Sequence, residues 1–389
     1  MKQIEFLKAW DLKWSLRRFI AIGLLTFLFG NGTICAATDD ENFDNGVTKT
    51  ITYHNGITFY TISFTEIDSI YYMFNEDMTA SVRPRSFTVQ RDKSGCEMST
   101  IYPENSYNGD VVIPNKVVYK GKTYVVSSIG LGAFRNCSKL RALTIPSSIK
   151  YIHFNQFQRD GHSTLEELHI NDFAAWCSIE FTHVSETIDH VSPEYEFPDN
   201  YIHPLEIAES VFVGNDILLI DKIRIPKETK EIGQYNFLLC HNIKEVVIPE
   251  GVETICDFCF MDCYNLEKVT LGKSLSSIGD RSFMRCTNIK TIVSFIENPV
   301  GITEYTYDNS VYSNATLYVP RGTKDRYLSC SGWSNFINIQ EFDPAAIKKI
   351  IEDKEQGFKN SSTYDLQGRR VSSPKQGEIY IQGGRKVKR

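Results

Sequence analysis

The apolar positions between residues 232 and 300 repeat with a fixed period. Three segments, IGQYNFLLCHNIKEVVIPEGVET, ICDFCFMDCYNLEKVTLGKSLSS and IGDRSFMRCTNIKTIVSFIENPV, begin at Ile232, Ile255 and Ile278, and each is 23 residues long. Five apolar columns stay aligned across the three segments. One such unit cannot bury its apolar face alone, whereas stacked units share a continuous core, so the repeat predicts a solenoid.

The spacing within each segment predicts the structure of one coil. Near its end, as in Leu266-x-x-Val269-x-Leu271, apolar residues stand two apart, which is the period of a strand with one buried face. Before it, apolar residues stand three apart, which suits a short helical or 3₁₀-like turn. We therefore expect a repeat solenoid of α+β type, a leucine-rich-repeat array of period 23 with a parallel β-sheet on one face.

The chain also carries the marks of an exported protein. Lys13, Arg17 and Arg18 precede the apolar run Phe19–Phe29, and small residues before Ala37 suit cleavage there. We expect residues 1–37 to be a signal peptide, with a retained membrane anchor or a lipidated Cys35 as alternatives. The net charge of −6 and pI near 5.8 give no basic footprint, so nucleic acid is not an expected partner.

Two columns of the repeat, one aromatic and one of cysteine, are expected to be structural. An earlier copy, IGLGAFRNCSKLRALTIPSSIKY from Ile129, carries both columns. A small apolar residue with a weak donor suits a tight coil interior, so the cysteines are assigned to packing. The structural repeat positions are Phe134, Cys137, Phe237, Cys240, Phe260, Cys263, Phe283 and Cys286.

The pair Cys256-x-x-Cys259 suggests a zinc or redox motif when it is considered alone. Within the repeat, Cys256 stands in the column of Gly233 and Gly279, and Cys259 in that of Asn236, so two independent substitutions make the pair. A zinc site would need a second pair, and no metal or cofactor is expected. A disulfide with a neighbouring coil stays open, because disulfides persist in exported proteins.

The repeat resembles the BspA-type leucine-rich repeats of bacterial cell-surface proteins. Their pattern I-G-x-x-A-F-x-x-C-x-x-L-x-x-[LV]-x-[IL]-P-x-x-[VI]-x-x-I is matched nearly throughout by SSIGLGAFRNCSKLRALTIPSSIKYI. Gly272 stands where the previous repeat has Pro249, a departure that leaves the buried columns intact. The resemblance implies an exported protein at or beyond the outer surface of a Gram-negative bacterium, either secreted or associated with the cell surface or outer membrane. Its prototype activity would be adhesion to host matrix proteins or to other cells.

The segments around the repeats divide the rest of the chain. An Asn55-Gly56 turn between alternating runs predicts a hairpin, and residues 38–124 are expected to form a β-rich N-terminal cap. The solenoid is expected over 125–342, with an insertion at 171–216 and an aromatic C-terminal cap at 315–342. In the insertion, Trp176, Phe181, Tyr195 and Tyr201 either form a contact surface or pack onto the solenoid.

The C-terminal segments have patterns of their own. Asp343 and Pro344 before an apolar stripe predict a short helix or linker over 343–362. The tail 363–389 contains two strand-like runs and resembles the sorting-like module Y-D-L-Q-G-R-x-V…G-I-Y-I-x-x-G-x-K-V of exported proteins in the same bacterial group. That resemblance implies secretion or sorting machinery as a partner, while the alternative is a basic β-hairpin tail without a receptor.

No set of residues has the spacing of a catalytic site. The eight histidines include no H-E-x-x-H or related arrangement, and no phosphate-binding glycine loop is present. We therefore expect no enzyme; an enzyme or inhibitor within the insertion and a passive envelope component are the alternatives. The predicted function is recognition of an extracellular protein or glycan by the solenoid sheet. Its candidate residues, the outward strand positions, are Thr144, Glu167, His169, Arg224, Glu245, Val247, Lys268, Thr270, Thr291 and Val293.

Overall fold

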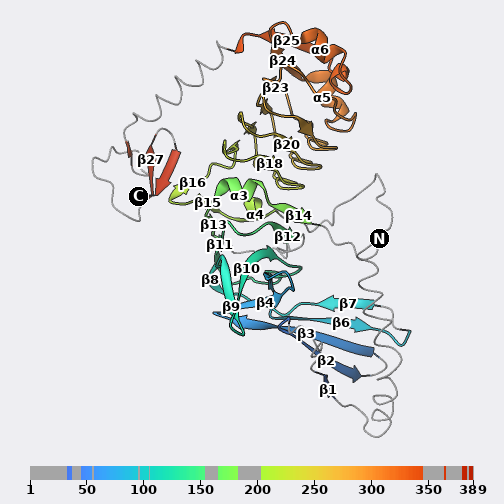
Figure 1. Ribbon diagram of the computed structural model, residues 1–389, viewed down its shortest axis with the longest axis vertical. Helices are drawn as coiled ribbons and strands as arrows, with labels where there is room; N and C mark the ends of the chain where they lie inside the picture. The colour runs from blue at the N-terminus through green and yellow to red at the C-terminus, as the bar shows by residue number, and fades with distance from the viewer. Residues whose placement is uncertain are drawn as a thin grey trace.

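The computed structural model describes residues 33–36, 45–54, 57–94, 97–104, 106–153, 165–182, 203–344, 363–364, 379–382 and 385–388. These residues form an elongated stack of strands, with the N-terminal strands at one end and β25 and α6 at the other (Figure 1). No helix within these ranges has the length and apolar character needed to cross a membrane. Except for 33–36, the predicted signal peptide lies outside them.

The N-terminal part consists mainly of antiparallel strands. A long hairpin pairs β2 (Val47–His54) with β3 (Ile57–Ile67) on either side of the predicted turn, whose residues 55 and 56 are outside the described ranges. β5 (Thr79–Arg83) then pairs in parallel with β10 (Lys122–Ile129), which joins this part to the coils. The other strands here are β1 (Thr33–Ala36), β4 (Ile70–Phe74), β6 (Ser86–Arg91) and β7 (Glu97–Ile101).

A tight hairpin connects β9 (Lys116–Tyr119) to β10. Tyr119 pairs with Lys122, and the two residues between them have positive φ, 47° at Lys120 and 76° at Gly121. A two-residue turn with positive φ at both positions matches the right-handed twist of the flanking strands. Glycine is needed at the second position because it adopts this backbone conformation without steric strain.

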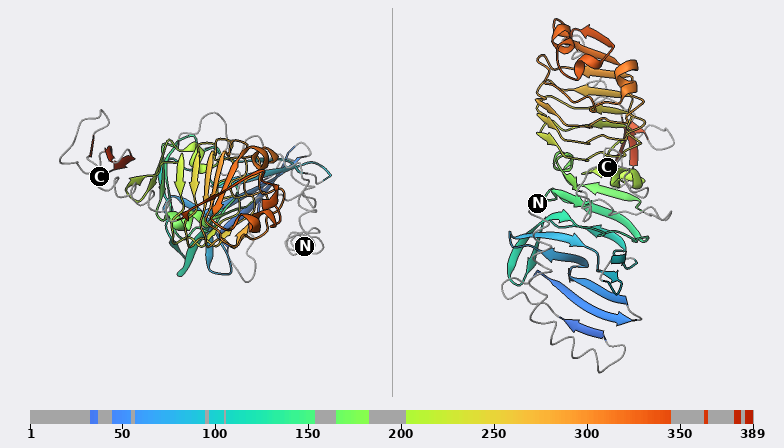
Figure 2. Two further views of the ribbon diagram at one scale, coloured as in Figure 1. Left: turned by 90° about the horizontal axis from the view of Figure 1, so that it is seen from above. Right: turned by 90° about the vertical axis from the view of Figure 1, so that its right-hand side faces the viewer.

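Parallel sheets run along two sides of the coils (Figure 2). In the first coils, one side carries β8 (Gly109–Val112), β11 (Leu140–Ile145), β13 (Glu167–Ile170) and β15 (Ser210–Val213), and the other carries β10, β12 (Tyr151–His153) and β14 (Glu180–Thr182). The second side was not expected from the sequence. Apart from β10, its strands in these coils are three residues long, too short for an alternating pattern of apolar residues to distinguish them.

The later coils continue this arrangement as separate sheets. A six-stranded parallel sheet consists of β17 (Lys222–Arg224), β19 (Glu245–Val247), β21 (Lys268–Leu271), β23 (Thr291–Ser294), β24 (Thr316–Pro320) and β25 (Asn338–Phe342). The second side carries β18 (Glu231–Ile232), β20 (Thr254–Ile255) and β22 (Ser277–Ile278). Ile232 pairs with Ile255, and Ile255 pairs with Ile278, so successive coils stack with the apolar columns in register.

The aromatic column forms a stack through the core. The rings of Phe237, Phe260, Phe283 and Tyr307 are nearly parallel, with successive centroids 5.0, 5.2 and 5.2 Å apart. All four side chains are fully buried. Burial of such large apolar rings against one another stabilises the packing of each coil on its neighbours.

The segments between the two sheets are 3₁₀-like turns, one of the two forms expected for this part of the coil. Asn236, Leu238 and Cys240 donate backbone hydrogen bonds three residues back, as in a 3₁₀-helix. The alternate residues, 235, 237 and 239, donate instead to carbonyls of the next coil. Tyr235 and Leu239 have positive φ, 57° and 60°, and a right-handed helix cannot continue through residues in this conformation.

Most of the described part of the expected insertion belongs to the solenoid. From residues 171–216, β14 pairs with β12 and β15 pairs with β13, so both ends extend the sheets of the first coils. Two short helices, α3 (Phe173–Cys177) and α4 (Pro204–Ile207), lie between these strands. Residues 183–202, which include Tyr195 and Tyr201, are outside the described ranges.

An aromatic cluster is buried next to the last coil. Tyr307, Tyr312, Trp333 and Phe336 pack together, and each is at most 4% exposed. The cluster lies among α5 (Asn309–Asn314), β24, α6 (Lys324–Leu328), the 3₁₀-helix η1 (Trp333–Asn335) and β25.

The tail contributes three short strands. β27 (Ile379–Gln382) forms an antiparallel pair with β28 (Arg385–Lys388) and another with β26 (Thr363–Tyr364). β28 also pairs with β16 (Asp216–Ile217), so the tail lies beside the first sheet (Figure 1). The short helix or linker expected at 343–362 falls almost wholly on residues 345–362, outside the described ranges.

Candidate binding surface

The six-stranded sheet exposes two columns of side chains. Its central column, from Ile223 through Val246 to Ile339, is at most 5% exposed and faces the core. Because side chains alternate along a strand, the residues on either side of this column face outward. The outward columns are Lys222, Glu245, Lys268, Thr291, Thr316 and Asn338, and Arg224, Val247, Thr270, Val293, Tyr318 and Gln340.

The structure divides the residues predicted from sequence between two sheets. Thr144, Glu167 and His169 lie on β11 and β13, in the sheet of the first coils. The others lie on the six-stranded sheet, which has no strand in common with the first. They are Arg224, Glu245, Val247, Lys268, Thr270, Thr291 and Val293. Thr270 and Val293 are only 9% and 8% exposed, so a ligand would reach little of either side chain.

The surface of the first coils is charged. His169 Nε2 lies 2.9 Å from Glu167 Oε2, and the His169 ring stacks on Phe212 at 4.8 Å. The guanidinium of Arg141 pairs with Asp110 and lies 3.8 Å from Glu167. The hydrogen bond to Asp110 raises the pKa of Arg141. Opposite charges therefore already satisfy one another on this patch.

Ion pairs also connect the first strands of the six-stranded sheet. Lys268 Nζ lies 3.2 Å from Glu245 Oε1 on the neighbouring strand. The same relation between adjacent coils recurs in Lys230–Glu253 at 2.9 Å, Lys273–Glu250 at 2.6 Å and Lys290–Glu267 at 3.4 Å. Exposed pairs of this kind contribute about 0–1 kcal/mol each, so they define the charge of the surface more than its stability.

The outward positions of the last three strands are uncharged, and four of them are not among the candidate residues predicted from the sequence. These are Thr316, Tyr318, Asn338 and Gln340, on β24 and β25. The segment was interpreted as a cap, whose role is to cover the core. The alternation around Leu317 and Val319, both fully buried, was the signal that could have placed Thr316 and Tyr318 on the outer face.

Two cysteines of the repeat, Cys263 and Cys286, lie in the interior as hydrogen-bond donors. The Cys263 thiol donates to the carbonyl of Phe237 at 3.1 Å, and the Cys286 thiol donates to that of Phe260 at 2.9 Å. Burial raises the pKa of the Cys263 thiol well above its usual value. A buried protonated thiol is a poor nucleophile and a poor metal ligand.

The Cys256-x-x-Cys259 pair shows no metal-site geometry. Cys259 is fully buried, and burial raises the pKa of the half-buried Cys256 to about 12. The cysteines whose side chains the structure describes are free thiols, namely Cys137, Cys177, Cys240, Cys256, Cys259, Cys263, Cys286 and Cys330. Within the described ranges, no three histidine, cysteine or acidic side chains gather as metal ligands would. At Gly233, in the column of Cys256, an added Cβ would lie 2.1 Å from the carbonyl oxygen of Ile179, so glycine allows close approach of the coils.

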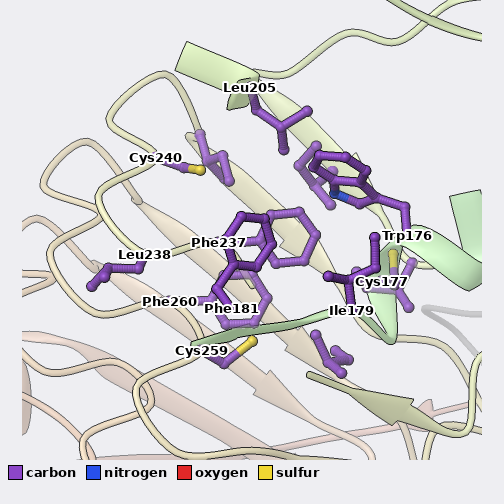
Figure 3. Close-up of a cluster of buried hydrophobic side chains, with 14 of the residues drawn as sticks. Trp176, Cys177, Ile179, Phe181, Leu205, Phe237, Leu238, Cys240, Cys259 and Phe260 are labelled. Atoms are coloured by element: carbon purple, nitrogen blue, oxygen red, sulfur yellow. The ribbon is translucent and has the colours of Figure 1, made fainter. Parts of the chain in front are cut away.

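Side chains from the expected insertion anchor it to the solenoid (Figure 3). Trp176 and Phe181 are 1% and 2% exposed and lie beside Phe237 in the core. The Asn236 side chain donates to the carbonyls of Trp176 at 2.8 Å and Ile179 at 2.7 Å. Of the four aromatic residues expected either to form a contact surface or to pack inward, these two pack inward.

His203 is buried at the same junction. Its ring lies 4.9 Å from that of Phe181, and its Nδ1 accepts a hydrogen bond from the backbone N–H of Leu205. Burial lowers the pKa of His203 from its ordinary 6.5 to about 3. The neutral ring is therefore a packing element at neutral pH.

A model of the BspA type leucine rich repeat region matches the chain in six copies, over residues 120–194 and 205–324. No curated protein matches significantly.

Several solved structures are also similar to the chain. That of the pneumococcal vaccine antigen PcpA has 15% identity and a TM-score of 0.25, and covers 75% of this chain and 99% of its own. A leucine-rich repeat protein of T. pallidum has 14% identity, a TM-score of 0.26 and coverages of 75% and 95%. A leucine rich cell surface protein of Faecalibacterium prausnitzii has 14% identity, a TM-score of 0.25 and coverages of 73% and 96%.

Proposed function

Because the chain belongs to the family of BspA-type leucine-rich repeat proteins, we propose that it is an exported, non-catalytic recognition protein that acts at the bacterial surface. In this proposal it binds an extracellular protein or glycan through the outer face of its six-stranded sheet. The observation that carries the proposal is that this face presents two columns of varied side chains over a fully packed core. A rigid array of this kind can recognise a ligand without reorganising.

The remaining segments serve this surface in the proposal. Residues 38–124 and 315–342 cap the two ends of the solenoid 125–342, so that its core is not exposed. Residues 1–37 direct export, and 363–389 engage secretion or sorting machinery. Fractionation of cells, with the intact mass of the mature chain, tests both terminal assignments, and an uncleaved chain in the cytoplasm would refute them.

Binding is tested with the purified mature protein on an array of extracellular-matrix proteins and glycans. We expect saturable binding of at least one ligand, and we expect substitutions on the sheet face to weaken it. The paired control is Lys230→Ala, which removes an exposed charge from the edge of the coils beside β18. Turnover in a hydrolase screen that a point substitution abolishes would contradict the non-catalytic role.

A further inference from the structure

The outward side chains of the six-stranded sheet change from mostly charged to uncharged along the solenoid. On β17, β19 and β21, most outward side chains carry a charge: Lys222, Arg224, Glu245 and Lys268. On β23, β24 and β25, the outward side chains are Thr291, Val293, Thr316, Tyr318, Asn338 and Gln340, and none is charged. The only acidic side chain on β25, Glu341, accepts hydrogen bonds from the backbone N–H groups of Gly322 and Lys324 and so is directed to the start of α6.

Aromatic rings border this neutral half. Phe295 follows β23 directly, and Phe342 is the last residue of β25, opposite Pro320 of β24. The two phenylalanine rings meet edge to face with centroids 5.2 Å apart. Tyr318 stands two residues before Pro320 on the same face of β24, and all three rings are half-buried. Aromatic side chains held in this way lose little conformational freedom when they contact a ligand.

Hydroxyl and amide groups lie beside the rings. Asn338 Nδ2 donates to Thr316 Oγ1 at 2.6 Å, and Gln340 Nε2 donates to Asn338 Oδ1 at 3.4 Å. Both amide side chains are exposed. Each group can form further hydrogen bonds, because a hydroxyl both donates and accepts while a side-chain amide has two donors and two lone pairs. Adjacent strands are about 4.8 Å apart, so β23 to β25 span about 10 Å, the size of two sugar rings.

We propose that the outer face of β23, β24 and β25 binds a neutral glycan. Phe295, Tyr318 and Phe342 contact the C–H faces of the sugars, and Thr316, Asn338 and Gln340 hydrogen-bond their hydroxyls. An anionic polysaccharide is disfavoured because these strands present no outward cation. This inference rests on the proposed recognition role and adds the class of ligand and the part of the sheet that binds it.

The test measures binding of the mature protein to soluble β-glucan, mannan and xylan, with heparin as the anionic comparison. We expect one of the three neutral polysaccharides to bind, and Tyr318→Ala to weaken it by about tenfold, the effect of losing a stacked ring. The double variant Asn338→Ala/Gln340→Ala should weaken it as well. Tyr318→Phe retains the ring and should bind nearly as well as the parent, provided that circular dichroism shows all variants folded.

The matched control is Lys230→Ala/Glu253→Ala, an exposed ion pair that lies outside the six-stranded sheet, which should leave glycan binding unchanged. Raising the salt from about 0.1 M to about 1 M should also leave it unchanged, because no charge takes part. The inference is overturned if none of the three polysaccharides binds, or if Tyr318→Ala binds as well as the parent. A salt-sensitive protein ligand whose binding is lost in Lys222→Ala/Arg224→Ala would overturn the glycan assignment and leave the recognition role standing, whereas absence of any ligand would remove both.

Discussion

Single side chains differ widely in how much they contribute to the stability of this solenoid. The central ring of the aromatic stack should contribute most. Phe260 lies between Phe237 and Phe283, at 5.0 and 5.2 Å, and is fully buried. We expect Phe260→Ala to reduce the free energy of unfolding by about 3–5 kcal/mol, because the stack cannot collapse around the cavity. Urea unfolding measures the loss. Tyr264→Ala, at a side chain 41% exposed, is the control and should change stability by less than about 1 kcal/mol.

A second residue-scale effect depends on pH. His203 has its pKa lowered by burial to about 3, so between pH 6.5 and about 3 the unfolded chain binds a proton that the folded chain does not. The contribution of His203 to the free energy of unfolding is therefore complete above pH 6.5. It decreases as the pH falls below 6.5, by up to about 1.4 kcal/mol per pH unit. Urea unfolding of the parent and of His203→Gln at pH 7, 6, 5 and 4 measures the effect. We expect the advantage of the parent to shrink as the pH falls; two parallel curves would show that His203 is not responsible.

At the scale of single elements, the β9–β10 hairpin offers a stabilising substitution. Lys120 holds a φ of 47°, which costs a residue other than glycine, asparagine or aspartate about 1 kcal/mol. Lys120→Asn creates the Asn-Gly pair that this type of turn prefers, so we expect unfolding to become less favourable by up to about 1 kcal/mol. Thermal unfolding tests this. Lys122→Asn, within β10, should not raise the stability of the protein, because asparagine is disfavoured in strands.

The same elements show how far the sequence could predict the structure. Residues such as Val246 and Val269 were placed correctly, because apolar residues two apart can bury one face only as a strand. The 3₁₀-like turns were expected, but the positive φ values of Tyr235 and Leu239 were not, because neither residue is the glycine or asparagine that signals this conformation. The neutral surface around Tyr318 was overlooked because its strand lies in a segment interpreted as a cap. The predicted surface is split because β17 and β15 belong to different sheets. No local feature of the sequence indicates this break.

At the scale of the whole molecule, the coils are joined by contacts between nearest neighbours, and this has a consequence for deletions. Removing residues 255–277 would join Thr254 to Ile278, which occupies the position that Ile255 had. Phe237 would then face Phe283, Cys240 would face Cys286, and β19 would adjoin β23, so every column would be restored one coil shorter. In a solenoid, stability is close to a sum of coil and interface contributions, so the shortened protein should still fold, with lower stability.

A deletion of 255–274 is the matched comparison, since it removes almost as much chain but shifts the later coils by three residues. Polar positions would then face the core, and the coils after the deletion could not stack on those before it. We expect the in-register deletion to keep the far-ultraviolet circular dichroism spectrum and the protease resistance of residues 278–342, and the other deletion to lose both. If the two deletions behaved alike, the columns would not be what holds the coils together. Because Tyr318, Asn338 and Gln340 keep their neighbours in the in-register deletion, that variant should also retain the binding face of β23 to β25.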